Sequence, residues 1–205
     1  MPLDDPAVEA GPLPEECAAF LRQIGSPEVF PEGLEIFPEG ISDDRELRTF
    51  LDTYQSRFLI PLEIPTITRA RSHAASGHAR ELIALDAEVS AKPVWPALAS
   101  ASRRIGRAQL KSLRPLRDER TVQRYLAAVE SGQATGWHTV VFGMTLAVYS
   151  WPLRHGLLTY GRETLTALAF AARPDTVSES ACVDILNPLF LQLPEAIEQA
   201  LAEPW

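Results

Sequence analysis

A run of 14 almost uninterrupted apolar residues, from Val140 to Leu153, is the feature that most constrains how this chain can fold. The run is shorter than the roughly 18 residues that suggest a membrane span. A helix that is apolar on all sides is normally buried at the centre of a protein. We therefore expect residues 138–150 to form a central helix, which makes an apolar hairpin with a second helix over residues 153–173.

Apolar residues recur at helical spacing along most of the remaining chain. One such stripe runs from Leu47 to Phe58 and follows Ser42-Asp43-Asp44, a segment typical of a helix start. The chain also has 17 prolines, which interrupt α-helices. We therefore expect several short helices rather than long rods, with a break in this stripe at Pro61 and Pro65.

No segment shows the alternation of apolar and polar residues that is typical of strands, and no internal repeat is found. The sequence predicts an all-α fold, a single-domain helical bundle of about eight or nine helices around the apolar hairpin. Residues 1–14 are acidic and rich in proline, and they predict a mobile tail. The domain itself is expected to extend over residues 15–203.

The segment from Trp95 to Leu113 predicts a helix with two distinct faces. Gly106 lies in the apolar arc, where a missing side chain would let another helix approach closely. The adjacent arc is strongly basic, and no acidic residue occurs within residues 97–117. Its members are Arg103, Arg104, Arg107, Lys111 and Arg114. Such an arc is most often a solvated face, but on a chain of net charge -8 it is also a candidate for binding an acidic partner.

Composition argues against several classes of protein. A net charge of -8 argues against a broad nucleic-acid surface, which is normally basic. The two cysteines, Cys17 and Cys182, form no CxxC motif, which argues against zinc, iron–sulfur and disulfide frameworks. Two free thiols in a core suit a reducing cytosol, and the N-terminus lacks the pattern of a signal peptide. We expect a cytoplasmic protein that binds neither nucleic acid nor membranes.

Few residues suggest catalysis. The motifs GxGxxG, GxxxxGK[ST], HExxH and GxSxG are absent. His78 and Glu81 could share a helix face, but a surface ion pair explains them better than a metal site. His138 is expected to form local hydrogen bonds at the start of its helix, with an interface role as the alternative. No catalytic residue, cofactor or metal site is predicted, and a small all-α enzyme would require a polar pocket with two or more titratable groups.

Short motifs occur along the chain in a recognisable order. They are Gly33-Leu34-Glu35 followed by Glu39-Gly40-Ile41 and Glu46-Leu47; Ala84-Leu85-Asp86-Ala87; Ser102-Arg103-Arg104-Ile105-Gly106-Arg107 with Leu110; and His138-Thr139-Val140-Val141-Phe142-Gly143 before the apolar hairpin. In this order and spacing they resemble the urease accessory protein UreF family over most of residues 15–203.

The resemblance implies a non-enzymatic helical adaptor that dimerises. Such an adaptor bridges a UreD-type protein, also called UreH, to the GTPase UreG, and the assembly delivers nickel to apo-urease. Together with the basic arc, the resemblance gives the candidate partner-binding residues Glu35, Arg103, Arg104, Arg107, Lys111, Arg114 and His138. Candidate structural residues are Gly106, Phe142 and Gly143.

Two departures from the family pattern leave an alternative open. The pattern FPxGxFxxSxGLE is contracted here to Phe30-Pro31-Glu32-Gly33-Leu34-Glu35. The family's PLGQ turn is replaced by Arg173-Pro174-Asp175-Thr176. Both departures favour a divergent UreF-like interaction module whose partner is not part of the urease system.

Overall fold

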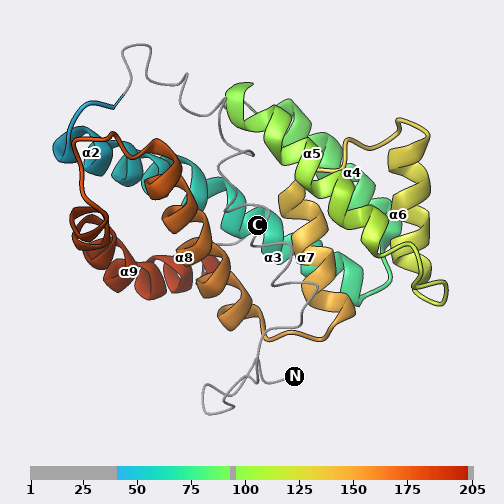
Figure 1. Cartoon of the computed structure of the whole chain (residues 1–205). Coiled ribbons are helices and arrows are strands. Elements are labelled where there is room, and N and C mark those ends of the chain that lie inside the picture. Colours follow the sequence, from blue (N-terminus) through green and yellow to red (C-terminus); the bar gives the residue numbers. More distant parts are fainter. Residues whose placement is uncertain (1–40, 93–95, 203–205) are drawn as a thin grey trace.

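The described part of the chain consists of helices joined by short connections (Figure 1). This computed structural model describes residues 41–92 and 96–202, and it contains no strand in those ranges. The helices are α2 (Asp44–Tyr54), η2 (Gln55–Glu63), α3 (Ile64–Ala75), α4 (Ala79–Ala91), α5 (Pro96–Ser112), α6 (Arg120–Glu130), α7 (His138–Val148), α8 (Leu153–Ala172) and α9 (Glu179–Ala202). Since α2, η2 and α3 follow one another without a break, the described ranges hold seven continuous helices rather than eight or nine. The predicted all-α class is confirmed.

Side chains cap the start of α2 as the sequence pattern predicts. The Asp43 carboxylate accepts a hydrogen bond from the backbone N–H of Glu46 at 2.8 Å. The Glu46 carboxylate in turn accepts from the backbone N–H and the hydroxyl of Ser42, at 2.9 and 2.7 Å. These two hydrogen bonds from Ser42 lower the pKa of Glu46. The cap satisfies donors that every helix start leaves unpaired, and it places carboxylates at the positive end of the helix dipole.

The predicted break at Pro61 and Pro65 is wrong, because the chain stays helical through both prolines. Proline has no amide donor, and its ring collides with the carbonyl one turn earlier in an α-helix. The π-helix η2 has a wider turn, and Pro61 lies within it. Pro65 lies in the first turn of α3, a position where proline is well tolerated. The resulting helix from Asp44 to Ala75 is far longer than the short elements that the proline count predicted.

Helix α9 is a second exception to that expectation. It runs for 24 residues although Pro188 and Pro194 lie inside it. A buried apolar stripe extends along its whole length and anchors the turns on both sides of each proline. The stripe consists of Cys182, Ile185, Leu186, Leu189, Leu193, Ile197 and Ala200.

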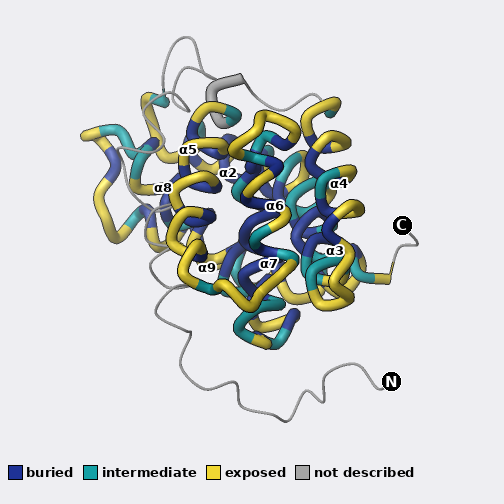
Figure 2. Tube along the Cα trace, turned by 90° about the vertical axis from the view of Figure 1, so that its right-hand side faces the viewer, coloured by how far each residue is buried: buried dark blue, intermediate teal, exposed yellow. Residues whose placement is uncertain are grey.

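Two hydrophobic clusters share the helices at the centre of the molecule. In Figure 1, α2, α8 and α9 lie on one side and α4, α5 and α6 on the other, with α3 and α7 between them. Ile67 of α3 and Phe142 of α7 belong to the first cluster, whereas Ala70 and Val141 of the same two helices belong to the second. The central position predicted for the apolar helix is confirmed, and Figure 2 shows α7 buried along much of its length.

The two halves of the predicted apolar hairpin, α7 and α8, pack on different neighbours. Helix α7 packs chiefly against α3 and α5, and α8 packs chiefly against α9. Direct contact between the halves includes the Phe142 and Tyr160 rings, whose centroids are 5.0 Å apart. The hairpin is therefore open: α7 contributes side chains to both hydrophobic clusters, and α8 contributes to the first.

Among the helices of residues 41–92 and 96–202, none is both long and apolar enough to cross a lipid bilayer.

Candidate functional site

The predicted basic arc forms an exposed face of α5 and of the turn after it, and groups from other segments contact three of its members. All five basic residues of the arc are exposed. The Arg103 guanidinium lies 5.9 Å from the centroid of the Trp137 ring. Arg107 Nε donates a hydrogen bond to the backbone carbonyl of Thr135 at 2.9 Å. Arg114 forms an ion pair with Glu130 of α6. The arc, hereafter the α5 basic face, therefore has an acidic neighbour, which α6 supplies from outside residues 97–117.

The loop that supports the α5 basic face is fixed by one buried carboxylate, Asp86 of α4. Asp86 is 1% exposed and accepts a hydrogen bond from the Tyr125 hydroxyl at 2.6 Å. It also accepts from three successive backbone N–H groups, those of Thr135, Gly136 and Trp137, at 2.6, 3.0 and 3.3 Å. A buried carboxylate is tolerated when several donors surround it. Asp86 thus joins α4, α6 and the segment that leads into α7.

Two glycines let this loop approach α5. Gly136 has a φ of +82°, in the left-handed region that side chains disfavour. A Cβ placed on Gly106 would overlap the carbonyl oxygen of Gly136 and lie 2.7 Å from the backbone nitrogen of His138. The sequence predicted a helix as the close neighbour of Gly106. The structure instead places there the last turn of the loop and the first residue of α7.

His138 joins three helices, whereas its place at the start of a helix predicted local hydrogen bonds. Its Nδ1 lies 2.5 Å from the Ser102 hydroxyl of α5, and its Nε2 lies 2.6 Å from the Tyr160 hydroxyl of α8. The Tyr160 hydroxyl donates to Glu63 Oε2 of η2 at 2.9 Å, and the Tyr54 hydroxyl donates to Glu63 Oε1 at 2.8 Å. We call these five residues the polar chain.

When Glu63 is ionised, counting protons fixes the direction of the polar chain. A tyrosine hydroxyl has one proton, and that of Tyr160 is donated to Glu63. His138 Nε2 must then carry a proton and donate it to the Tyr160 oxygen. A neutral imidazole leaves Nδ1 free to accept from the Ser102 hydroxyl. Every donor in the polar chain thus points toward the Glu63 carboxylate.

Burial shifts the pKa values of Glu63 and His138 in the polar chain. Desolvation raises the pKa of Glu63 to about 7, against the opposing effect of the hydrogen bonds from Tyr54 and Tyr160. Desolvation lowers the pKa of His138 to about 4. The same burial raises the pKa values of Tyr54 and Tyr160 well above the ordinary value, with the Glu63 charge adding to the effect. His138 is therefore neutral at pH 7, whereas Glu63 is divided between its two forms.

The polar chain borders a pocket with a cavity volume of about 60 Å³. Its walls come from α2, η2, α3, α4, α5, the start of α7 and α8. The lining residues are Tyr54, Phe58, Leu62, Glu63, Thr66, Val89, Lys92, Ser102, Ile105, Trp137, His138, Thr139 and Thr164. We call this space the Glu63 pocket. It is mostly apolar, with the polar groups gathered around one carboxylate.

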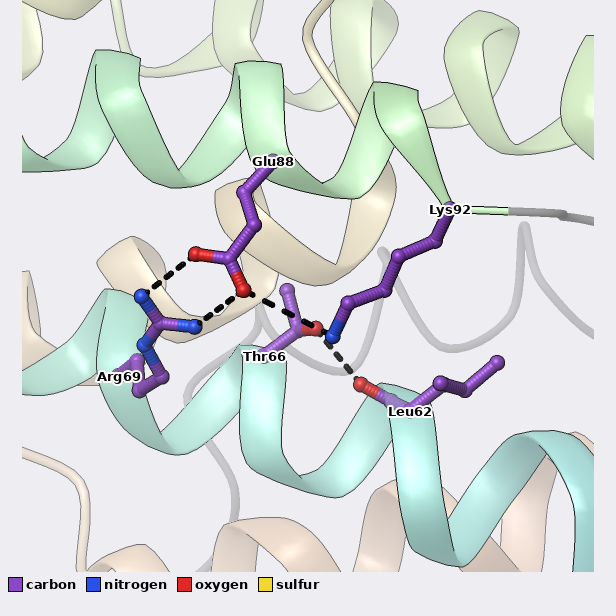
Figure 3. A network of polar contacts seen from close by, with 5 residues as sticks. All are labelled: Leu62, Thr66, Arg69, Glu88 and Lys92. Carbon is purple, nitrogen blue, oxygen red and sulfur yellow. Dashed lines mark hydrogen bonds and ion pairs between the residues drawn. The ribbon is translucent and has the colours of Figure 1, made fainter. Parts of the chain in front are cut away.

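An ion pair joins α3 to α4 beside Lys92, which lines the pocket (Figure 3). Arg69 donates two hydrogen bonds to the Glu88 carboxylate, at 2.8 and 2.7 Å. Lys92 Nζ lies 3.7 Å from the same carboxylate. Thr66 uses its hydroxyl within its own helix, where it donates to the backbone carbonyl of Leu62 at 2.6 Å. The Lys92 ammonium is thus paired with Glu88.

The remaining candidate residues lie in different places. Gly143 is buried where α7 meets the backbone of α3, and Phe142 is buried against Tyr160. Cys182 is a buried free thiol, whereas Cys17 and Glu35 lie outside the described residues. In the part of the chain that the structure describes, no three His, Cys, Asp or Glu side chains gather as metal ligands would.

Sequence reasoning missed the most polar residue of the pocket, Glu63, together with its partner Tyr160. Glu63 stands alone between apolar residues of a helix, and no motif marks it. Tyr54 lies nine residues earlier, which is two and a half turns of an α-helix, so helical periodicity would place the two on opposite faces. Tyr160 comes 97 positions later than Glu63, so periodicity could not connect the two.

Comparison with known protein families matches residues 41–173 to the UreF family. The match covers about two-thirds of the 205-residue chain, and it includes Asp86, the α5 basic face and the polar chain. None of the curated proteins compared with the chain matches it. The family match agrees with the resemblance that the sequence motifs suggest. The chain therefore belongs to the UreF family of urease accessory proteins, and this membership implies an accessory rather than an enzymatic role in urease maturation.

Proposed function

We propose that this protein is a cytoplasmic adaptor that bridges a UreD/UreH-type protein and a UreG-type GTPase during nickel insertion into apo-urease. In this proposal the protein acts as a homodimer, and nickel is cargo of the assembly. GTP hydrolysis belongs to the UreG-type partner. The protein contributes binding surfaces, which is the kind of function that its family membership supports.

The α5 basic face is the observation that carries this proposal. Four cations share one exposed face of α5, and Arg114 adds a fifth from the turn that follows, on a chain of net charge -8. The loop behind them is immobilised by Asp86 and by the close approach of Gly106, so the face is presented on a rigid support. A preorganised charged surface favours fast and selective association with an acidic partner. We propose Arg103, Arg104, Arg107, Lys111 and Arg114 as its contact residues.

Glu35 and His138 complete the proposed partner-binding set in different ways. Glu35 is proposed on the family motif alone, since it lies outside the described residues. His138 is half-buried and uses both ring nitrogens in the polar chain. We propose that it acts on partner binding by holding α5, the start of α7 and α8 together.

Reconstitution tests the adaptor role directly. The full chain is mixed with the UreD-type and UreG-type proteins of the same genome, and complexes are measured by size-exclusion chromatography with light scattering. The expected result is a ternary complex that contains two copies of this chain, and no complex of the other two proteins in its absence. Failure of this chain to bind either protein would contradict the proposal.

The alternative is a UreF-like module that serves a partner outside the urease system. One observation favours it: the family match ends at residue 173, where the PLGQ turn is replaced, and α9 lies beyond the match. A chain that dimerises but binds neither UreD-type nor UreG-type protein would support this alternative.

A further inference from the structure

Among the described residues, the Glu63 carboxylate accepts fewer hydrogen bonds than it has lone-pair sites. An ionised carboxylate has about four lone-pair sites, and the hydroxyls of Tyr54 and Tyr160 occupy two of those on Glu63. Thr164 also lines the pocket; it is 1% exposed, and a hydrogen bond between its side chain and Tyr160 acts to lower the pKa of Tyr160. Glu63 lines the pocket, so its remaining lone-pair sites can accept hydrogen bonds from a bound group.

The charge of the pocket is also uncompensated. Glu63 forms no ion pair with any described residue, and Lys92, which lines the same pocket, is paired with Glu88. His138 carries no charge at pH 7, because burial holds its pKa at about 4. Arg103 of α5 is turned toward the Trp137 ring. The positive charges around the pocket are therefore engaged elsewhere.

The shape of the pocket suits a small cationic group. The cavity of about 60 Å³ is several times the roughly 10–15 Å³ that one water molecule requires. Tyr54, Phe58 and Trp137 contribute aromatic walls, which attract cations through the negative faces of their rings. An anion would be repelled by Glu63, and a neutral group would leave its charge unmatched.

We propose that the Glu63 pocket receives one lysine or arginine side chain of a protein partner. The inference rests on the proposed adaptor role, because it assigns the missing donor to a bound protein. The cationic head group donates to the open lone pairs of Glu63 and to Thr164 Oγ1, and the aromatic walls cover its alkyl stem. Binding holds Glu63 ionised and so keeps every donor of the polar chain directed toward it.

The first experiment uses small probes on the full-length protein. Methylguanidinium is titrated at pH 8 while the signals of Thr164 and Tyr160 are followed by NMR, and neutral methylurea of nearly the same shape serves as the matched probe. Methylguanidinium is expected to saturate these shifts, at concentrations at least about tenfold lower than methylurea. Binding should weaken at pH 6, because Glu63, whose pKa is about 7, must lose its proton.

Two variants test whether Glu63 is the residue that prefers methylguanidinium over methylurea. Glu63→Gln should abolish the preference for methylguanidinium, whereas Glu88→Gln removes a neighbouring carboxylate and should preserve it. Equal binding of both probes to the parent, or equal binding of methylguanidinium to the parent and to Glu63→Gln, would overturn the cation site.

The second experiment measures partner affinity. Glu63→Gln should weaken binding of the UreD-type or the UreG-type protein by about tenfold or more, with Glu88→Gln unchanged. If the parent binds both partners and Glu63→Gln binds them equally well, the partner side chain is the wrong occupant although the adaptor role stands. If the parent binds neither partner, the adaptor role and the partner side chain fail together, and the probe titration alone decides whether the pocket selects cations.

Discussion

Within the polar chain, Glu63 and His138 make the stability of the protein depend on pH in opposite directions. Glu63 takes up a proton more readily in the folded state than its ordinary pKa of 4.5 implies, because burial raises its pKa to about 7. His138 takes one up less readily than its ordinary pKa of 6.5 implies, because burial lowers its pKa to about 4. Stability from Glu63 is complete below pH 4.5 and is lost as pH rises through 7. Stability from His138 is complete above pH 6.5 and is lost as pH falls through 4.

These opposing slopes should be separable by mutation. In the parent they largely cancel between pH 4.5 and 6.5. Glu63→Gln should leave the His138 slope, so the free energy of unfolding should rise with pH across this window. His138→Gln should leave the Glu63 slope, so the free energy of unfolding should fall as pH rises. The fall should be on the order of 3 kcal/mol over the full difference between the folded and unfolded pKa of Glu63. Urea denaturation at several pH values measures both, and parallel profiles in the two variants would contradict the assignment.

Gly106 provides a test in which two effects compete. Alanine favours a helix over glycine by about 1 kcal/mol, so propensity alone would make Gly106→Ala stabilising. The added Cβ would overlap backbone atoms of residues 136–138, which cannot rotate away. We expect Gly106→Ala to destabilise the protein by about 1–3 kcal/mol. Ala108→Gly, on the exposed side of α5, is the control and should cost only about 1 kcal/mol. A raised melting temperature for Gly106→Ala would show that the loop can move aside.

At the scale of elements, the hydrogen bonds of Asp86 hold α4, α6 and the start of α7 together. Asp86→Asn keeps the shape of the side chain but turns a donor toward groups that are themselves donors. Leaving buried N–H groups unpaired should reduce the free energy of unfolding by about 2–4 kcal/mol. Asp52→Asn, at an exposed position of α2, should change it by less than about 0.5 kcal/mol. Chemical denaturation compares the two, and similar midpoints for both variants would refute the role of Asp86.

The helices were largely predictable from the sequence, whereas the contacts between them were not. Helical periodicity predicted the stripe that forms α2, and the apolar run identified α7 as central, because a helix that is apolar on all sides is normally buried. The continuous helix through Pro61 was missed because a π-turn has no simple sequence signature. Asp86 could be singled out by its motif. The contact between Glu63 and Tyr160 could not, since it depends on how α8 is oriented against η2.

At the scale of the whole molecule, the α5 basic face should govern how fast partners associate. Arg107→Glu with Lys111→Glu reverses two of its charges, and both residues point away from the core. We expect association with an acidic partner to slow by about tenfold at low salt, with a smaller difference at high salt. Surface binding at two ionic strengths measures this, with circular dichroism to verify folding. Arg80→Glu with Arg124→Glu, at exposed positions of α4 and α6, is the matched control. Equal association rates for both double variants would show that the α5 basic face contacts solvent and does not steer a partner.

The helix that continues from Asp44 to Ala75 has a consequence for cooperativity. It enters both hydrophobic clusters, so neither cluster can melt without removing part of the other's wall. Each cluster contains a buried tryptophan, Trp151 in the first and Trp137 in the second. Variants that retain only one of these two, with Trp95 and Trp205 also replaced by phenylalanine, should therefore report the same denaturation midpoint from opposite sides of the molecule. Different midpoints would mean that the shared helix unfolds locally at η2, and that the two hydrophobic clusters unfold independently.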